Sequence, residues 1–265
     1  FARKSIFGYK AIVFSSLMIA VAGSLVWAHH MYTSGMSDTA VFVFSLLTFI
    51  VAIPSAIKVF SWISTLYKGS IQMSPPLFYA LCFIYLFSVG GLTGLVLGAA
   101  GPDIHVHDTA FVVAHFHFTM FGGTGFAFFA GLHYWWPKLF GRMYNFKTAY
   151  LSGVLITVGF MFHYVPMFII GLQGMPRRYH DYLPQFEQGN YLAGYGAVIM
   201  VIGMFMMLIN LLIGIKKGAV TDSNPWGGVT LEWQVPSPPP LHNFVSEPKI
   251  MDYPYDFSRF FKKNK

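Results

Sequence analysis

Charged side chains are scarce in this sequence. Asp, Glu, Lys and Arg make up only 10% of the 265 residues, whereas 55% are hydrophobic. Soluble domains carry roughly 25% charged residues because their surfaces face water, so an ordinary water-soluble domain is excluded. Cysteine is nearly absent as well. The single Cys82 allows no internal disulfide, and its place in an apolar run predicts a buried free thiol.

Acidic residues are rarer than basic ones, 10 against 17, and the net charge is +7. The basic residues fall in short segments between apolar runs. This pattern is typical of loop charges that orient membrane helices, not of a nucleic-acid-binding groove. We therefore expect contact with a lipid membrane and no nucleic-acid partner.

Six apolar stretches are long enough to cross a hydrocarbon core, which needs about 20 residues. None alternates between polar and apolar residues as a barrel strand does, and helices are the other structure that satisfies every backbone group in lipid. The predicted spans are 9–33, 39–64, 74–99, 108–136, 148–172 and 191–215. The sequence thus predicts an all-α membrane protein with a six-helix region, 1–215, and an extended Pro-rich polar tail, 216–265, lying on the membrane surface or on a partner subunit.

The loop charges predict an orientation. Basic residues at the N-terminus and after the second, fourth and sixth spans share one side, which the positive-inside rule makes cytoplasmic or matrix-facing. These residues are Arg3, Lys4, Lys10, Lys68, Lys138, Arg142, Lys147, Lys216 and Lys217. Asp38, Asp103 and Asp108 lie on the outer side. Arg177 and Arg178 are also outer, against the rule, which predicts a local anionic partner.

Two adjacent histidines, His29 and His30, lie at the outer end of the first span, in the string WAHHM. Neighbouring helical residues are about 100° apart, so both imidazoles can converge on one metal beside the helix end. Imidazole suits copper, iron and zinc, and histidine within a membrane span is usually functional. The alternative is a pair of interfacial histidines bonded to water or carbonyls.

His115 and His117 flank Phe116 in the fourth span. Residues two apart on a helix point about 200° apart, so two metals, one on each side, fit better than one shared metal. Each imidazole could be an axial ligand of a heme iron, with Phe116 between the two cofactors. The alternative is two core histidines bonded to neighbouring helices.

The two histidine clusters agree in depth. His115 lies about eight residues, or roughly 12 Å, below the outer end of its helix. A heme held by His115 could face a copper ion held by the first cluster. Its propionates would then point outward to Arg177 and Arg178, because Arg binds carboxylates bidentately. A lipid phosphate is the alternative partner of this Arg pair.

His107 and Asp108 begin the fourth span, where an acidic residue suits a helix N-terminus. Capping is one reading of this pair, and contact with a hard cation or a propionate is the other. Asp103 has a weaker claim, and His105 has no clear role. The remaining histidines are expected to be structural or interfacial: His133, His163, His180 and His242.

Lys58 lies within an apolar span, four residues after Pro54. An intramembrane lysine is a functional candidate by default, and Ser55, one turn away, could share a water chain with it. We expect a proton input from the inner side. The alternative is a side chain that reaches the nearby inner interface.

Together these residues resemble subunit I of heme–copper terminal oxidases, from the seventh of its twelve helices onward. The matching strings are WAHHMYTSGM, IPSAIKVFSW, GGLTGLVL, HDTAFVVAHFHFTM and GMPRRYHDY, and the resemblance covers roughly residues 8–215. It implies that His29 and His30 bind the copper ion CuB. It also implies that His115 binds the high-spin heme iron and His117 the low-spin heme iron.

The resemblance implies further roles for polar residues. It assigns Arg177 and Arg178 to heme propionates, and His107 and Asp108 to a propionate and a magnesium site shared with subunit II. Three residues would form a K-type proton path: Lys58, Ser55 and Thr48. Many relatives have Thr at the position of Ser55, so a hydroxyl is retained.

The implied activity is that of cytochrome c oxidase, which reduces O2 to water and pumps protons. The implied cofactors are heme a, heme a3 and CuB, with Mg at the subunit II interface. The implied partners are subunit II with its copper centre that accepts electrons, subunit III, and cytochrome c as donor. A quinol-fed oxidase, a nitric oxide reductase, and a transporter or assembly subunit with a degenerate metal site are the alternatives.

Some residues of the family's metal sites and proton paths are expected to come from another segment of the subunit. The third CuB histidine, the cross-linked tyrosine, the second axial ligand of the low-spin heme and the D-type proton path lie upstream in the family. The sequence starts at Phe1 without a signal-peptide pattern. We therefore expect an N-terminal half, in the same or a separate chain. The string NPWGGVTLEWQVPSPPPLHNF resembles bacterial members that use heme a, which favours a bacterial plasma membrane over the mitochondrial inner membrane.

Overall fold

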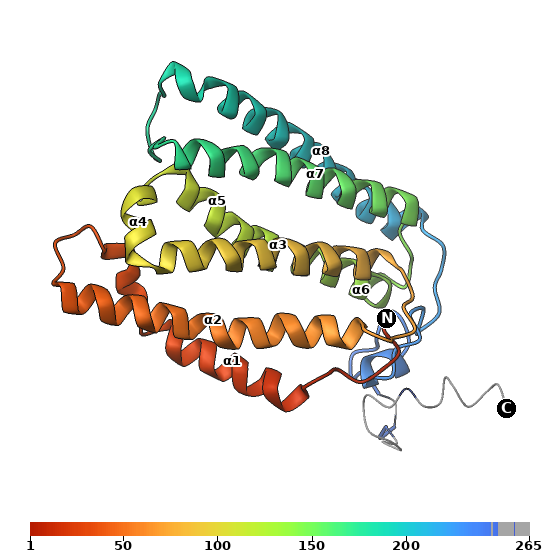
Figure 1. Ribbon diagram of the computed structural model, residues 1–265. Coiled ribbons are helices and arrows are strands. Elements are labelled where there is room, and N and C mark those ends of the chain that lie inside the picture. Colours follow the sequence, from red (N-terminus) through yellow and green to blue (C-terminus); the bar gives the residue numbers. More distant parts are fainter. Residues whose placement is uncertain (245, 249–256, 258–265) are drawn as a thin grey trace.

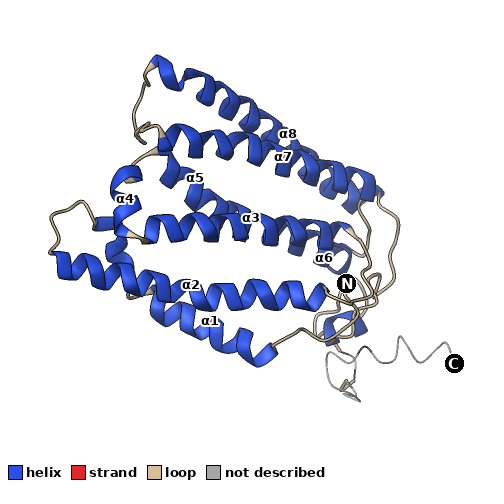
Figure 2. Ribbon diagram, in the orientation of Figure 1, coloured by secondary structure: helices blue, strands red, loops and turns tan. Residues whose placement is uncertain are grey.

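Helices dominate the computed structural model, which describes residues 1–244, 246–248 and 257 (Figure 1, Figure 2). Within these residues, five helical segments are long and apolar enough to cross a membrane. They are α2 (Asp38–Leu66), α3 (Pro75–Gly98), the run Ala110–Phe140, α7 (Phe146–Leu172) and the run Pro184–Lys217, which contains α8 (Glu187–Lys217). A shorter apolar helix, α1 (Tyr9–Gly23), precedes them. The predicted all-α membrane fold is confirmed for the described residues.

The predicted first span, 9–33, was too long. Helix α1 ends at Gly23, and Trp27–Met31 forms a separate 3₁₀ turn, η1. Helix α1 ends because of local hydrogen bonds made by Ser24. The Ser24 Oγ donates to the Val21 carbonyl at 2.7 Å, and the Ser24 N–H donates to the Ala22 carbonyl. These bonds occupy carbonyls at the end of the helix. His29 and His30 therefore lie on a 3₁₀ turn and not on an α-helix.

The fourth predicted span, 108–136, is built from several pieces. A short helix, α4 (Ala100–Val106), comes before the membrane run, which then consists of α5 (Ala110–Thr119), a π-helical segment η2 (Met120–Gly125) and α6 (Phe126–Phe140). The side chain of Thr109 accepts a hydrogen bond from Phe111 N at 3.2 Å and caps α5. The capping reading of Asp108 was therefore wrong, and Thr109 has that role.

The helices lie side by side, with α1 and α2 at one edge and α7 and α8 at the other (Figure 1). Between them, α3 packs against α5 and α6, and a buried aromatic cluster joins α3, α5, α6 and α7. Helix α2 is covered far less, since only 6% of its apolar window is buried within this chain. Much of its surface is therefore available to lipid, to another polypeptide or to a cofactor.

The first part of the predicted tail returns to this chain's own helix ends. The N-terminus and the residues after α8 lie at the same end of the helices (Figure 1). Lys138, 5% exposed, donates from Nζ to the carbonyls of Ser223 at 2.8 Å and Val235 at 2.7 Å. Trp233 Nε1 donates to Tyr134 Oη at 2.7 Å. The tail residues 245, 249–256 and 258–265 lie outside the described residues.

Candidate metal centre

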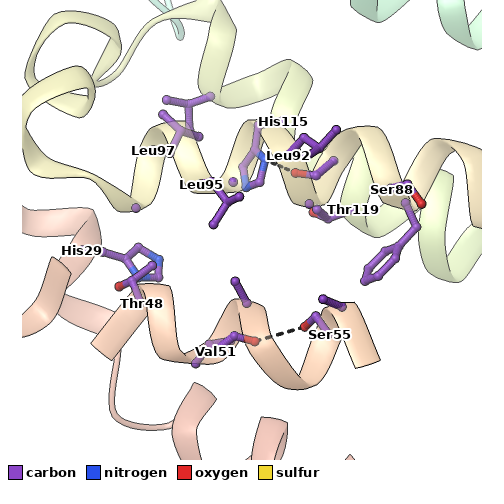
Figure 3. Close-up of a pocket in the computed structure, with 18 of the residues that line it drawn as sticks. His29, Thr48, Val51, Ser55, Ser88, Leu92, Leu95, Leu97, His115 and Thr119 are labelled. Atoms are coloured by element: carbon purple, nitrogen blue, oxygen red, sulfur yellow. Dashed lines mark hydrogen bonds between the residues drawn. The ribbon is translucent and has the colours of Figure 1, made fainter. Parts of the chain in front are cut away.

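A cavity of about 640 Å³ lies between α2 and α3 and reaches the outer polar segment around α4. Its volume is within the roughly 300–1,000 Å³ of small-molecule and cofactor pockets. In Figure 3, His29, Thr48 and Ser55 lie on one side of this space, and His115 and Thr119 lie on the other. Eight of the predicted site residues line it: His29, His30, Thr48, Ser55, His107, Asp108, His115 and Arg177.

The imidazoles of His29 and His30 converge. Their Nε2 atoms are 3.1 Å apart, although the two residues lie on a 3₁₀ turn. Thr48 Oγ1 donates to the Phe44 carbonyl at 2.6 Å, so it accepts from His29 Nδ1 at 3.2 Å. This bond places the proton of His29 on Nδ1, so its Nε2 lone pair faces His30 Nε2. Two imidazole nitrogens about 2.0–2.1 Å from one ion would be 3.1 Å apart at an angle of about 100°, so the pair fits a shared metal.

Two imidazoles do not complete a metal site, because metal sites of this kind take three or four protein ligands. Among the residues that the structure describes, no group of three or more His, Cys, Asp and Glu side chains could hold a metal ion. This chain therefore offers one part of a ligand set.

His115 is oriented by α3. Its Nδ1 lies 3.1 Å from the Gly90 carbonyl and 3.0 Å from Thr93 Oγ1. A carbonyl can only accept, so Nδ1 carries the proton and Nε2 keeps its lone pair. Histidines that bind metals usually have this second contact. Gly94 lets the ring approach α3, since a Cβ there would lie 3.0 Å from His115 Cε1.

His117 faces a different helix. Its ring stacks on Tyr164 of α7, with centroids 4.5 Å apart and planes 20° apart, and it does not line the cavity. Its Nδ1 donates to the Val113 carbonyl at 2.8 Å, which again leaves Nε2 with a lone pair. Phe116 lies 4.3 Å from the His117 ring. The two histidines two residues apart thus serve opposite sides of α5, one toward α3 and one toward α7.

Polar residues gather at the outer end of the cavity. Arg177 Nη2 is 2.6 Å from Asp108 Oδ1, and Arg177 N donates to the Asp108 carbonyl at 2.9 Å. Arg177 Nε is buried and has no hydrogen-bond partner in the described part of the chain. An unpartnered donor beside a cavity suits a carboxylate or phosphate. Asp108 is thus one anionic partner of this arginine. Arg178 is exposed and is not brought to the cavity.

Asp103 is closer to the site than its sequence pattern indicated. It is 4% exposed, lines the cavity and accepts from His107 Nδ1 at 2.9 Å. Burial raises the pKa of the Asp103 carboxyl above its ordinary value, and the hydrogen bond from His107 opposes that rise. The i, i+4 spacing of Asp103 and His107 was the available sequence signal, since such residues are neighbours on a helix.

Lys58 is the candidate that the structure does not bring to the cavity. Thr48 and Ser55 line it, but half-buried Lys58 does not. Lys58 is three residues after Ser55. Residues three apart on an α-helix differ by about 300°, which is about 60° short of a full turn, so Lys58 lies on the face of α2 next to that of Ser55. Ser55 Oγ donates to the Val51 carbonyl at 3.3 Å.

Comparisons with known proteins show which family this chain resembles. The family described as "Cytochrome C and Quinol oxidase polypeptide I" matches residues 1–206. "Cytochrome c oxidase subunit 1" of Thermostichus vulcanus is 44% identical over 256 residues, which are 97% of this chain and 46% of that protein. The protein of the same name from Bacillus sp. (strain PS3) is 43% identical over 253 residues, 94% of this chain and 41% of that protein. The chain therefore spans less than half the length of these relatives.

A solved structure is similar as well. It is described as a cryo-EM structure of a heme-copper terminal oxidase dimer that provides insights into its catalytic mechanism. The TM-score is 0.67 at 27% sequence identity, and the match covers 74% of this chain and 40% of that chain.

Proposed function

This chain belongs to the cytochrome c and quinol oxidase polypeptide I family, and from that premise we propose that it is part of the catalytic subunit of a terminal oxidase that reduces O2 to water and pumps protons. It is an integral membrane protein. The observation that carries the proposal is the pair of Nε2 atoms, from His29 and His30, that converge at 3.1 Å beside the cavity lined by His115.

The donor set fits copper and heme. His29 and His30 would hold the copper ion CuB, His115 the iron of heme a3 and His117 the iron of heme a, because the hydrogen bonds at Nδ1 of His29, His115 and His117 leave Nε2 available on each ring. Bound there, these groups supply the electron transfer and the O2 reduction. The chain's own contribution is to aim its imidazoles and to keep the cavity between α2 and α3 apolar over most of its wall.

The outer polar residues would bind carboxylates and a cation. Arg177, with its unpartnered Nε, would hold a heme propionate, and Arg178 would assist from the exposed side. His107 and Asp108 would contribute to a propionate contact and to a magnesium site shared with subunit II. Asp108 already neutralises Arg177 through their 2.6 Å ion pair.

The inner part of the cavity would receive protons. Ser55 and Thr48 line it and carry hydroxyls that can bond to water. Lys58, on the adjoining face of α2, would deliver protons from the inner side. Its amine must reach the hydroxyls through water or by a change of rotamer.

The chain would work as one half of a larger subunit. Its six helices would pair with an N-terminal half that supplies the missing CuB histidine, the tyrosine and the second ligand of the low-spin heme. Subunit II with a copper centre, subunit III and cytochrome c would be the partners, in a bacterial plasma membrane. The first part of the polar tail would cover the inner ends of this chain's own helices.

A quinol-fed oxidase is the second candidate, because the family description names quinol oxidases beside cytochrome c oxidases. The sequence of the subunit II partner separates the two. A copper-binding motif there favours cytochrome c as donor, and its absence favours quinol.

The test is the variant His29→Ala in the complete oxidase particle. We expect loss of the copper ion bound by this chain and of O2 consumption, with the low-spin heme spectrum retained. His105→Ala, which removes an exposed outer histidine, is the matched control and should leave copper content and turnover unchanged. Full O2 consumption by a His29→Ala particle that lacks this copper would overturn the proposal.

A further inference from the structure

The His117 ring contacts two aromatic rings. Tyr164 stacks on it with centroids 4.5 Å apart and planes 20° apart, and Phe116 lies with its centroid 4.3 Å away and its plane tilted by 30°. The bond from Nδ1 to the Val113 carbonyl ties one edge of the imidazole to its own helix. Together these contacts leave the ring little freedom to rotate about its bond to the backbone.

Tyr164 is itself held in place by neighbouring side chains. It is 6% exposed, and its ring packs on Phe160 at 4.6 Å and on the edge of His163 at 4.3 Å. His163 Nδ1 donates to the Ala193 carbonyl of α8 at 2.7 Å, which holds this level of α7 against α8. The Tyr164 ring is thus positioned by its neighbours on α7, a helix that His163 ties to α8.

We propose that Tyr164 is a positioning residue for His117 and sets the angle of its imidazole plane toward a low-spin heme. This rests on the proposed function, in which His117 is an axial ligand of that heme. Contacts around a ligating histidine fix its orientation and tune the metal. Phe116 follows any movement of α5, whereas Tyr164 comes from a separate helix and provides the fixed reference.

A second histidine in the chain provides a comparison. His133 stacks on Tyr79 with almost the same geometry, 4.5 Å and 21°, and is fully buried in the core. No cofactor role is assigned to His133. Loss of Tyr79 should therefore affect only the packing of the core and its hydrogen bonds to Ala149 and Ser152, whereas loss of the Tyr164 stack should change a heme signal.

The experiment measures electron paramagnetic resonance of the oxidised low-spin heme in the complete oxidase. Its g values respond to the orientation of the axial imidazole plane. Tyr164→Met removes the ring and refills the space with a flexible apolar side chain, and Tyr164→Phe keeps the ring. We expect the largest g value of the Met variant to shift or broaden by more than the wild-type linewidth. The Phe variant should match the wild type, and the high-spin heme spectrum should be unchanged in both.

The matched control is Tyr79→Met, which should leave the low-spin g values unchanged. If Tyr164→Met does not assemble, Tyr164→Leu is a second variant without a ring. A bound low-spin heme with wild-type g values and linewidth in the Met or Leu variant overturns the inference, as does an equal shift in Tyr79→Met. Absence of a low-spin heme from the unmodified particle would instead refute the proposed function.

Discussion

Gly94 allows the His115 imidazole to lie against α3, and its replacement by alanine tests whether that closeness matters. An added Cβ would lie 3.0 Å from His115 Cε1, where ordinary van der Waals contact begins near 3.4 Å. The ring must therefore move by a few tenths of an ångström. Its Nδ1 bond to the Gly90 carbonyl is already 3.1 Å long, so this movement weakens the bond that orients the ligand.

The cost can be estimated from overpacking. An extra methyl group in a packed site costs about 1–3 kcal/mol, which corresponds to about 5- to 150-fold weaker binding of whatever depends on that geometry. We expect Gly94→Ala to lower high-spin heme occupancy, measured by the carbon monoxide difference spectrum per particle. The low-spin heme spectrum should stay unchanged because His117 contacts α7 and not α3.

Gly194→Ala on α8 is the matched control. It raises helix propensity equally, but its Cβ would meet nothing within 4 Å. Full high-spin occupancy in Gly94→Ala, equal to that of the control, would refute the placement of His115 against α3.

Further variants test other contacts. Thr48→Val removes the acceptor for His29 Nδ1, so copper affinity should fall about 10- to 100-fold in metal titration. Lys58→Met should slow reduction of the O2-reducing centre in stopped-flow measurements, because it removes the proposed proton donor. Lys138→Met removes the bonds to two tail carbonyls and should destabilise the tail by about 1–3 kcal/mol, seen as faster limited proteolysis after α8. Arg177→Lys loses the unpartnered Nε and should shift the heme spectra.

The variants of Thr48, Lys58 and Lys138 each have their own contradicting result. Thr48→Ser keeps a hydroxyl and should retain copper, so equal loss in Thr48→Ser and Thr48→Val argues against the hydrogen bond. Normal turnover of Lys58→Met would remove Lys58 from the mechanism. An unchanged proteolysis rate in Lys138→Met would show that the buried amine does not hold the tail.

Much of the architecture was predictable because it is local. Long apolar runs specify membrane helices, and the 3.6-residue period specifies that two histidines two residues apart face opposite sides. The structure places His115 against α3 and His117 against α7. The adjacent pair His29 and His30 was expected to converge, and it does so on a 3₁₀ turn whose tighter period the apolar pattern did not indicate.

What the sequence did not predict depends on contacts between distant residues. The side chain of Lys138 bonds to carbonyls 85 and 97 residues away, and no local pattern predicts that return of the tail. Asp103 is polar in sequence but becomes buried by the packing of α4 against its neighbours. The apolar run around Lys58 indicated depth in the membrane but not which face of α2 it occupies.

Heme and copper analysis of the purified particle tests the central claim most directly. The account predicts two hemes for each copy of this chain, and one copper ion that disappears in the His30→Ala variant while the hemes remain. A particle that contains this chain but neither heme nor copper would contradict it.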